Sequence, residues 1–172
     1  VMQYALDQLH VRHIMVVGHY GCGGVMAALM GRRVGLVDNW LRHVQDVRNK
    51  HRPFLDGLPD DDARLKALCE LNVLEQALNV CETTVVQDAW ARGQSVVVHG
   101  WVYGLHNGLL QDLEMTVRDA GEVTAAYQRS LQAVHRRGGR GEPLKPPADP
   151  EPAADAPPGP EAAPWLDRPP AG

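Results

Sequence analysis

The chain has few aromatic residues, with one phenylalanine, four tyrosines and four tryptophans among its 172 residues. Because 44% of the residues are nevertheless hydrophobic, we expect a core built mainly from valine, leucine and alanine. The length suits one domain and a further segment. No apolar run approaches the roughly 20 residues that a membrane-spanning helix needs, so we expect no membrane partner.

The chain also lacks an excess of positive charge. It has 17 Lys and Arg residues against 21 Asp and Glu residues, a formal net charge of −4, and its basic residues are scattered. We therefore expect no nucleic-acid partner. Cysteine is equally scarce, because only Cys22, Cys69 and Cys81 are present. An odd number without a framework spacing argues against a secreted disulfide scaffold, so we expect a cytoplasmic protein.

The most informative stretch is HIMVVGHYGCGGVMAALM, from residue 13 to residue 30. The apolar run 14–17 has the length of a strand, a glycine-rich loop follows it, and helix-forming residues begin at Val25. The loop carries His19 and Cys22 in the spacing H-x-x-C, among glycines that let the backbone bend tightly. Imidazole and thiolate are ligands that zinc prefers. The stretch therefore predicts half of a zinc site.

A strand, a glycine-rich loop and a helix are also the layout of phosphate-binding loops. The P-loop pattern needs a lysine where Gly24 stands, and the dinucleotide pattern needs its third glycine where Met26 stands. Both patterns thus lack an essential residue. A further alternative without metal has His19 as a hydrogen-bonded loop residue and Cys22 as a small buried hydrophobe. The two residues alone do not decide between this alternative and a zinc site.

The periodicity of apolar residues predicts alternating helices and strands. Helices are expected over residues 1–9, 25–30, 38–50, 63–80, 84–90 and 122–136. Strands are expected over residues 14–17, 95–103 and 109–117. Asp38 should cap its helix, and Pro53 and Pro59 should frame a loop connection. The unbroken valines at 96–98 suit a strand covered on both faces, whereas Asn107-Gly108 predicts a turn and an antiparallel return strand. The order of elements predicts an α/β fold with a mostly parallel β-sheet flanked by helices.

The composition changes abruptly at Gly138. Residues 143–172 hold 11 of the 13 prolines, interleaved with alanine, glycine and acidic residues. Such a density of proline cannot support a packed core. We therefore expect a folded domain over residues 1–137 and a disordered Pro-rich C-terminal tail over residues 138–172.

The glycine-rich loop, VGHYGCGGV, closely resembles the second zinc motif of the β-class carbonic anhydrases of the cytoplasmic bacterial type. The likeness extends from residue 1 to about residue 127 and includes four further blocks in the family's order: DNWLRH at 38–43, LNV at 71–73, VQDAW at 86–90 and HGWVYG at 99–104. The resemblance implies one zinc ion held by two cysteines and one histidine, in which His19 and Cys22 would be the histidine and the second cysteine.

The resemblance also implies a reaction, the reversible hydration of carbon dioxide to bicarbonate and a proton. The backbone N–H of Gly23 would face the negative charge that develops on the substrate oxygens. Tyr103 aligns with a residue that helps hold bicarbonate at a separate inhibitory site in some bacterial members. Family members are dimers or tetramers, so the resemblance implies a homodimer or homotetramer for the complete protein.

One motif of the family has no counterpart here. Members carry an upstream C-x-D-x-R motif, which supplies the first cysteine ligand and an Asp-Arg pair beside the metal, and this chain begins after the point where that motif would lie. We therefore expect an N-terminally incomplete piece of a longer protein, with no complete catalytic set and no activity alone. The family layout does not support Cys69, Cys81, His99 or His106 as substitute ligands. The alternative function is a catalytically inactive, carbonic-anhydrase-like interaction module that recruits a partner through its tail.

Overall fold

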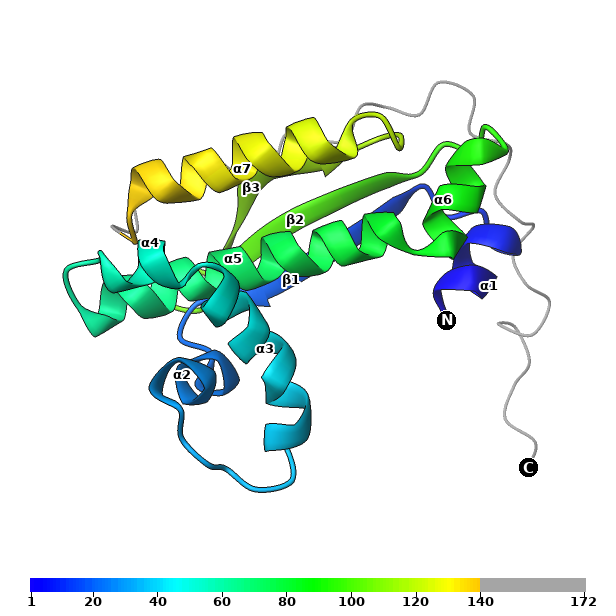
Figure 1. Cartoon of the computed structure of the whole chain (residues 1–172). Coiled ribbons are helices and arrows are strands. Elements are labelled where there is room, and N and C mark those ends of the chain that lie inside the picture. Colours follow the sequence, from blue (N-terminus) through cyan, green and yellow to red (C-terminus); the bar gives the residue numbers. More distant parts are fainter. Residues whose placement is uncertain (140–172) are drawn as a thin grey trace, which may run out of the picture.

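The computed structural model describes residues 1–139, so nearly all of the predicted disordered tail lies outside the described residues. Figure 1 shows helices packed around a small sheet. The helices are α1 (Met2–Asp7), α2 (Gly23–Met30), α3 (Asp38–Lys50), α4 (Arg52–Asp56), α5 (Asp61–Glu82), α6 (Thr84–Ala91) and α7 (Val123–Arg137). The strands are β1 (His13–His19), β2 (Val97–Gly104) and β3 (Leu109–Val117). The predicted α/β class is confirmed, and no helix within residues 1–139 is long and apolar enough to cross a membrane.

The sheet has three strands in the order β1-β2-β3. β1 and β2 pair in parallel, and β3 returns antiparallel to β2, as the turn at Asn107-Gly108 predicts. Gly108 has a φ of +71°, and the Asn107 side chain accepts a hydrogen bond from the backbone N–H of Leu109. These are the local features that make Asn-Gly a tight turn. The resulting sheet is mixed, with one pairing of each kind.

Helices α5 and α7 cover one face of the sheet. Along β2 burial alternates, so that Val98, Gly100 and Val102 are buried while His99 and Trp101 are partly exposed. The middle of α5 comes very close to the strands, because a Cβ added to Gly18 would lie 2.6 Å from Val73 Cγ2. A Cβ added to Gly100 on β2 would lie 3.5 Å from the same valine. The absence of side chains at Gly18 and Gly100 therefore lets α5 pack closely against the sheet.

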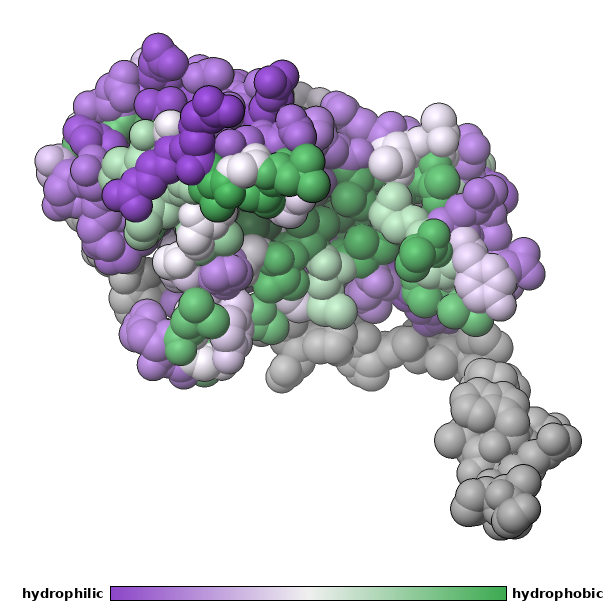
Figure 2. Space-filling view, turned by 90° about the horizontal axis from the view of Figure 1, so that it is seen from below, coloured by the Kyte–Doolittle hydropathy of each residue, from purple (hydrophilic) through white to green (hydrophobic). Residues whose placement is uncertain are grey.

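The opposite face of the sheet is largely open in the described part of the chain. On β1, Met15 and Val17 are 57% and 48% exposed. Figure 2 shows hydrophobic surface across the middle of the molecule on the side that faces downward in Figure 1, where β1 forms the lower edge of the sheet. The valine run of β2 predicts a strand covered on both faces. Within residues 1–139, only one face of the sheet is covered.

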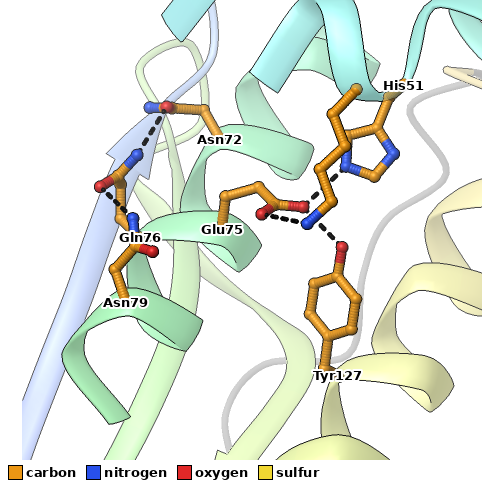
Figure 3. Close-up of polar contacts among 7 residues, drawn as sticks. His51, Asn72, Glu75, Gln76, Asn79 and Tyr127 are labelled. Carbon is orange, nitrogen blue, oxygen red and sulfur yellow. Dashed lines mark hydrogen bonds and ion pairs between the residues drawn. The ribbon is translucent and has the colours of Figure 1, made fainter. Parts of the chain in front are cut away.

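A cluster of polar side chains, buried except for Lys50, ties four helices together around Glu75 of α5 (Figure 3). The Glu75 carboxylate accepts hydrogen bonds from Lys50 Nζ and His51 Nε2, each at 2.7 Å, and from Tyr127 Oη at 2.5 Å. Burial raises the pKa of Glu75, but these three hydrogen bonds outweigh that effect and lower it to about 2. The carboxylate is therefore charged at neutral pH and joins the α3–α4 junction and α7 to α5.

Two local predictions are wrong. Residues 52–56, expected to lie in a loop, form the short helix α4, because Pro53 stands in the first turn, where a missing N–H costs nothing. Asp38 is the first residue of α3 rather than its cap. Its carboxylate instead accepts hydrogen bonds from the backbone N–H groups of Val34 and Gly35, at 2.9 and 3.3 Å. Asp38 therefore closes the loop between α2 and α3.

Candidate metal centre

The glycine-rich loop lies at the carboxyl end of β1, where a parallel strand passes into a helix. His19 is the last residue of β1, Cys22 is the N-cap residue of α2, and Gly23 is the first residue of that helix. Gly21, with a φ of +69°, makes the turn between them in a conformation that favours glycine. Both predicted metal ligands thus lie on one short turn, and both are partly exposed.

The ring of His19 is oriented by the loop itself. Its Nδ1 lies 3.0 Å from the carbonyl oxygen of Tyr20. Because a carbonyl can only accept a hydrogen bond, Nδ1 carries the proton in the neutral ring, which leaves the lone pair on Nε2. A histidine that donates from one ring nitrogen to a carbonyl is a typical arrangement for metal binding through the other nitrogen. The geometry therefore makes His19 Nε2 the available ligand atom.

The start of α2 presents backbone N–H groups beside the two ligands. The first N–H groups of any helix have no partner within it. Gly23 is exposed, and a Cβ added there would meet no atom within 4 Å in the described part of the chain. At Gly24, by contrast, an added Cβ would lie 3.2 Å from Leu41 Cδ2. The space beside Gly23 is thus open, which suits its predicted role in binding substrate oxygens.

The predicted bicarbonate residue Tyr103 lies next to this loop. It stands on β2 opposite His19 in the parallel register, and its carbonyl oxygen accepts a hydrogen bond of 3.1 Å from the backbone N–H of Tyr20. The structure therefore brings His19, Cys22, Gly23 and Tyr103 together around the end of β1. Their roles in binding metal, substrate or bicarbonate stay predictions.

Tyr20, Glu70 and Arg137 make a set of contacts behind the loop that the sequence analysis missed. The Tyr20 hydroxyl donates to Glu70 Oε1 at 2.6 Å, and Arg137 donates to the other carboxylate oxygen from Nη2 at 2.9 Å and from Nε at 3.3 Å. Burial and the Glu70 carboxylate raise the pKa of Tyr20, so its hydroxyl keeps its proton. The only sequence signal was an acidic residue, Glu70, within the apolar pattern of a long helix.

Cys69 lies beneath the loop but does not complete a metal site. Burial raises the pKa of its thiol to about 12, although the backbone N–H groups of Cys22 and Gly21 partly offset this effect. Cys69 therefore stays a neutral thiol at physiological pH, and within residues 1–139 it belongs to no group of three or more side chains that could hold a metal ion.

The other conceivable substitutes do not complete a site either. His99 lies on the open face of the sheet, where its Nε2 is 3.0 Å from His13 Nδ1. Cys81 is fully buried near the end of α5, and His106 is exposed in the turn after β2. Across residues 1–139, no group of three or more His, Cys, Asp or Glu side chains is arranged to hold a metal ion. His19 and Cys22 therefore fit zinc as two donors of a larger set.

Comparisons with known proteins agree with the resemblance seen in the loop. The carbonic anhydrase family model matches residues 1–110. A carbonic anhydrase of Emericella nidulans is 45% identical over 115 residues, which are 67% of this chain and 50% of that protein. A carbonic anhydrase of Pseudomonas aeruginosa is 30% identical over 142 residues, which are 77% of this chain and 63% of that protein. The chain spans about half the length of the curated relatives that it matches, which include fungal as well as bacterial proteins.

Solved structures give the same result for the fold. A β-carbonic anhydrase of Coccomyxa in complex with acetazolamide superposes with a TM-score of 0.68 and 39% identity, over 72% of this chain and 56% of that chain. A tetrameric β-carbonic anhydrase of Sordaria macrospora superposes with a TM-score of 0.62 and 32% identity, over 67% of this chain and 59% of that chain. The chain, which carries the family's H-x-x-C loop at the end of β1, therefore belongs to the β-class carbonic anhydrases.

Proposed function

We propose that the complete protein catalyses the zinc-dependent, reversible hydration of carbon dioxide to bicarbonate and a proton. The observation that carries this proposal is the loop in which His19 Nε2 and the Cys22 thiol flank the start of α2, in a chain of the carbonic anhydrase family. When bound, zinc lowers the pKa of its water from about 15.7 to about 7, which provides a hydroxide nucleophile near neutral pH.

The residues of this chain would supply part of the site. His19 would bind the metal through Nε2 while its Nδ1–H stays on the Tyr20 carbonyl, which fixes the ring. Cys22 would bind as a thiolate. The N–H of Gly23, at the positive end of α2, would stabilise negative charge on the substrate oxygens. The third protein ligand and the Asp-Arg pair would come from the C-x-D-x-R motif, so we propose that residues 1–172 alone are inactive.

Two further properties belong to the same proposal. We propose that the complete protein is a homodimer or homotetramer, supported by the tetrameric relatives of Sordaria macrospora. We also propose a reducing compartment, the cytoplasm, because Cys22, Cys69 and Cys81 are all free thiols in the structure.

The test compares the 172-residue chain with a form extended upstream through the C-x-D-x-R motif. Zinc per chain is measured by elemental analysis, and proton release is followed by stopped flow after mixing with carbon dioxide. We expect about one zinc ion per chain and rapid hydration in the extended form only. His19→Ala in the extended form should abolish both.

The outcomes separate the proposed enzyme from its rivals. An extended form that binds zinc and yet shows no hydration above background would contradict the catalytic proposal. Zinc in neither form would favour the inactive interaction module. Binding of phosphate esters that survives His19→Ala would favour a phosphate-binding protein instead.

A further inference from the structure

We infer that Tyr20, Glu70 and Arg137 form a chain of hydrogen bonds that holds the metal-binding loop in the conformation that binds zinc. Tyr20 is the positioning residue for His19 and Cys22. This inference rests on the proposed zinc site and adds residues to it. None of the three side chains would contact the metal. Their effect would pass through the backbone of the loop.

Tyr20 is held at three separate points. Its backbone N–H donates to the carbonyl oxygen of Tyr103 at 3.1 Å, which extends the β1–β2 pairing by one hydrogen bond beyond the end of β1. Its own carbonyl oxygen accepts the hydrogen bond from His19 Nδ1 at 3.0 Å. Its hydroxyl donates to Glu70 at 2.6 Å. The carbonyl that orients the His19 ring thus belongs to a residue whose side chain is fixed at its far end.

The anchor for the hydroxyl is itself rigid. Glu70 is 4% exposed, and its two carboxylate oxygens have different partners. Oε1 accepts a hydrogen bond from the Tyr20 hydroxyl, and Oε2 accepts hydrogen bonds from Nε and Nη2 of Arg137. The side chain of Arg137 is only 11% exposed. A buried carboxylate requires such a partner, and hydrogen bonds between charged groups are stronger than those between neutral groups. The ion pair therefore fixes the position at which Tyr20 is held.

The three residues come from elements far apart in the sequence. Tyr20 and Glu70 are 50 positions apart, and Glu70 and Arg137 are 67 positions apart. Arg137 is the last residue of α7, and Glu70 lies on α5, which packs against β1 and β2. The loop is thus tied to the two helices that cover the sheet. A glycine-rich loop needs such a tie because its backbone otherwise loses more conformational freedom when a metal fixes it.

The variant that tests the inference is Tyr20→Phe, which removes only the hydroxyl. Partners behind metal ligands typically change metal affinity by about 10- to 100-fold, so we expect zinc dissociation constants of the extended form to rise by roughly that factor. Zinc affinity is measured by competition with a chromophoric chelator. The conservative variant Arg137→Lys keeps the charge but loses the planar fork, so it should weaken zinc binding in the same direction and by less.

The chain offers a matched control in Tyr127→Phe. Tyr127 also donates its hydroxyl to a buried carboxylate of α5, Glu75, at 2.5 Å, but in the cluster of Figure 3 rather than behind the loop. Both variants lose one tyrosine–carboxylate hydrogen bond and should lose similar stability. Only Tyr20→Phe should weaken zinc binding. Equal zinc affinities in the two variants would overturn the inference.

A second readout needs no metal. In the 172-residue chain, the ¹⁵N chemical shifts of the His19 ring report which nitrogen carries the proton. We expect the proton on Nδ1 in the unaltered chain and in Tyr127→Phe, and a mixture of the two tautomers in Tyr20→Phe. An unchanged His19 tautomer in Tyr20→Phe would contradict the positioning role, whether or not the protein binds zinc. Failure of the unaltered extended form to bind zinc would instead contradict the proposed function alone.

Discussion

Gly18 shows how one absent methyl group sets the distance between a helix and a sheet. In Gly18→Ala the new Cβ would lie 2.6 Å from Val73 Cγ2, so the Val73 side chain, α5 or β1 must shift. Overpacking of this kind typically costs about 1–3 kcal/mol, and we expect urea unfolding to show a loss of that size. Gly23→Ala is the control, because an added Cβ there meets no atom within 4 Å.

A double-mutant cycle tests whether the stability lost in Gly18→Ala comes from the contact between the new Cβ and Val73. Adding Val73→Ala removes the clashing methyl group, so the combined variant should be more stable than the sum of the two single effects predicts. Simple additivity would mean that the cost of Gly18→Ala has another origin.

His99 is the residue that should make the stability of the chain depend on mild acid. Burial, with smaller effects from His13 and Arg118, lowers the pKa of His99 to about 4. In the unfolded chain its pKa is about 6.5, so between these two values the unfolded state binds more protons than the folded state. The contribution of neutral His99 is therefore complete above pH 6.5 and is lost as the pH falls toward 4.

This loss can be measured directly. Because His99 is partly exposed, we expect about 1–2 kcal/mol, less than the full shift at about 1.4 kcal/mol per pKa unit. Urea unfolding at a series of pH values should show a weaker dependence in His99→Gln than in the unaltered chain. His106→Gln, at an exposed turn residue, is the control. Equal pH profiles for His99→Gln and the unaltered chain would contradict this assignment.

At the scale of elements, the Glu75 cluster strengthens the attachment of α4 and α7 to α5. Glu75→Ala leaves His51, which is 7% exposed, without its carboxylate partner. Breaking a buried pair costs about 3–5 kcal/mol, and because the Lys50 side chain is 52% exposed we expect a loss of about 2–4 kcal/mol in thermal or urea unfolding. Glu82→Ala, at an exposed residue of the same helix, should change stability by about 0.5 kcal/mol or less.

The sequence predicted the elements whose patterns are local. The C-terminal end of α3 and both ends of β3 agree with the prediction, since apolar spacing and the Asn-Gly turn just before β3 are local signals. The helix α4 was missed because a proline in a first helical turn looks the same as a helix breaker. The loop ligands His19 and Cys22 could be found from their spacing. Glu70 could not, because its partners Tyr20 and Arg137 are brought to it only by the tertiary fold.

At the scale of the whole molecule, the open face of the sheet should control association. β1 is an edge strand in the described sheet, and Met15 and Val17 expose apolar side chains on it. Exposed apolar edge strands promote association between chains. We expect the 172-residue chain to self-associate at micromolar concentration, and the pair of changes Met15→Glu and Val17→Lys to shift sedimentation toward the monomer without lowering the melting temperature.

The control for this prediction changes equally exposed residues elsewhere. Val34 and Leu36, in the loop between α2 and α3, are 58% and 88% exposed. Val34→Lys with Leu36→Glu should leave the sedimentation of the chain unchanged. Association that responds to the loop pair and not to the β1 pair would show that another surface holds the chains together.

The parallel pairing of β1 with β2 also means that β1 must wait for its partner strand while the chain is synthesised on the ribosome. His13 and His99, which touch across these two strands, are 86 positions apart in the sequence. At about 5–20 residues per second, β1 and its loop leave the ribosome roughly 4–17 s before the strand that completes them. During that interval the apolar strand β1 has no native neighbour from β2, so it stays open to association for longer than a strand that pairs within a hairpin.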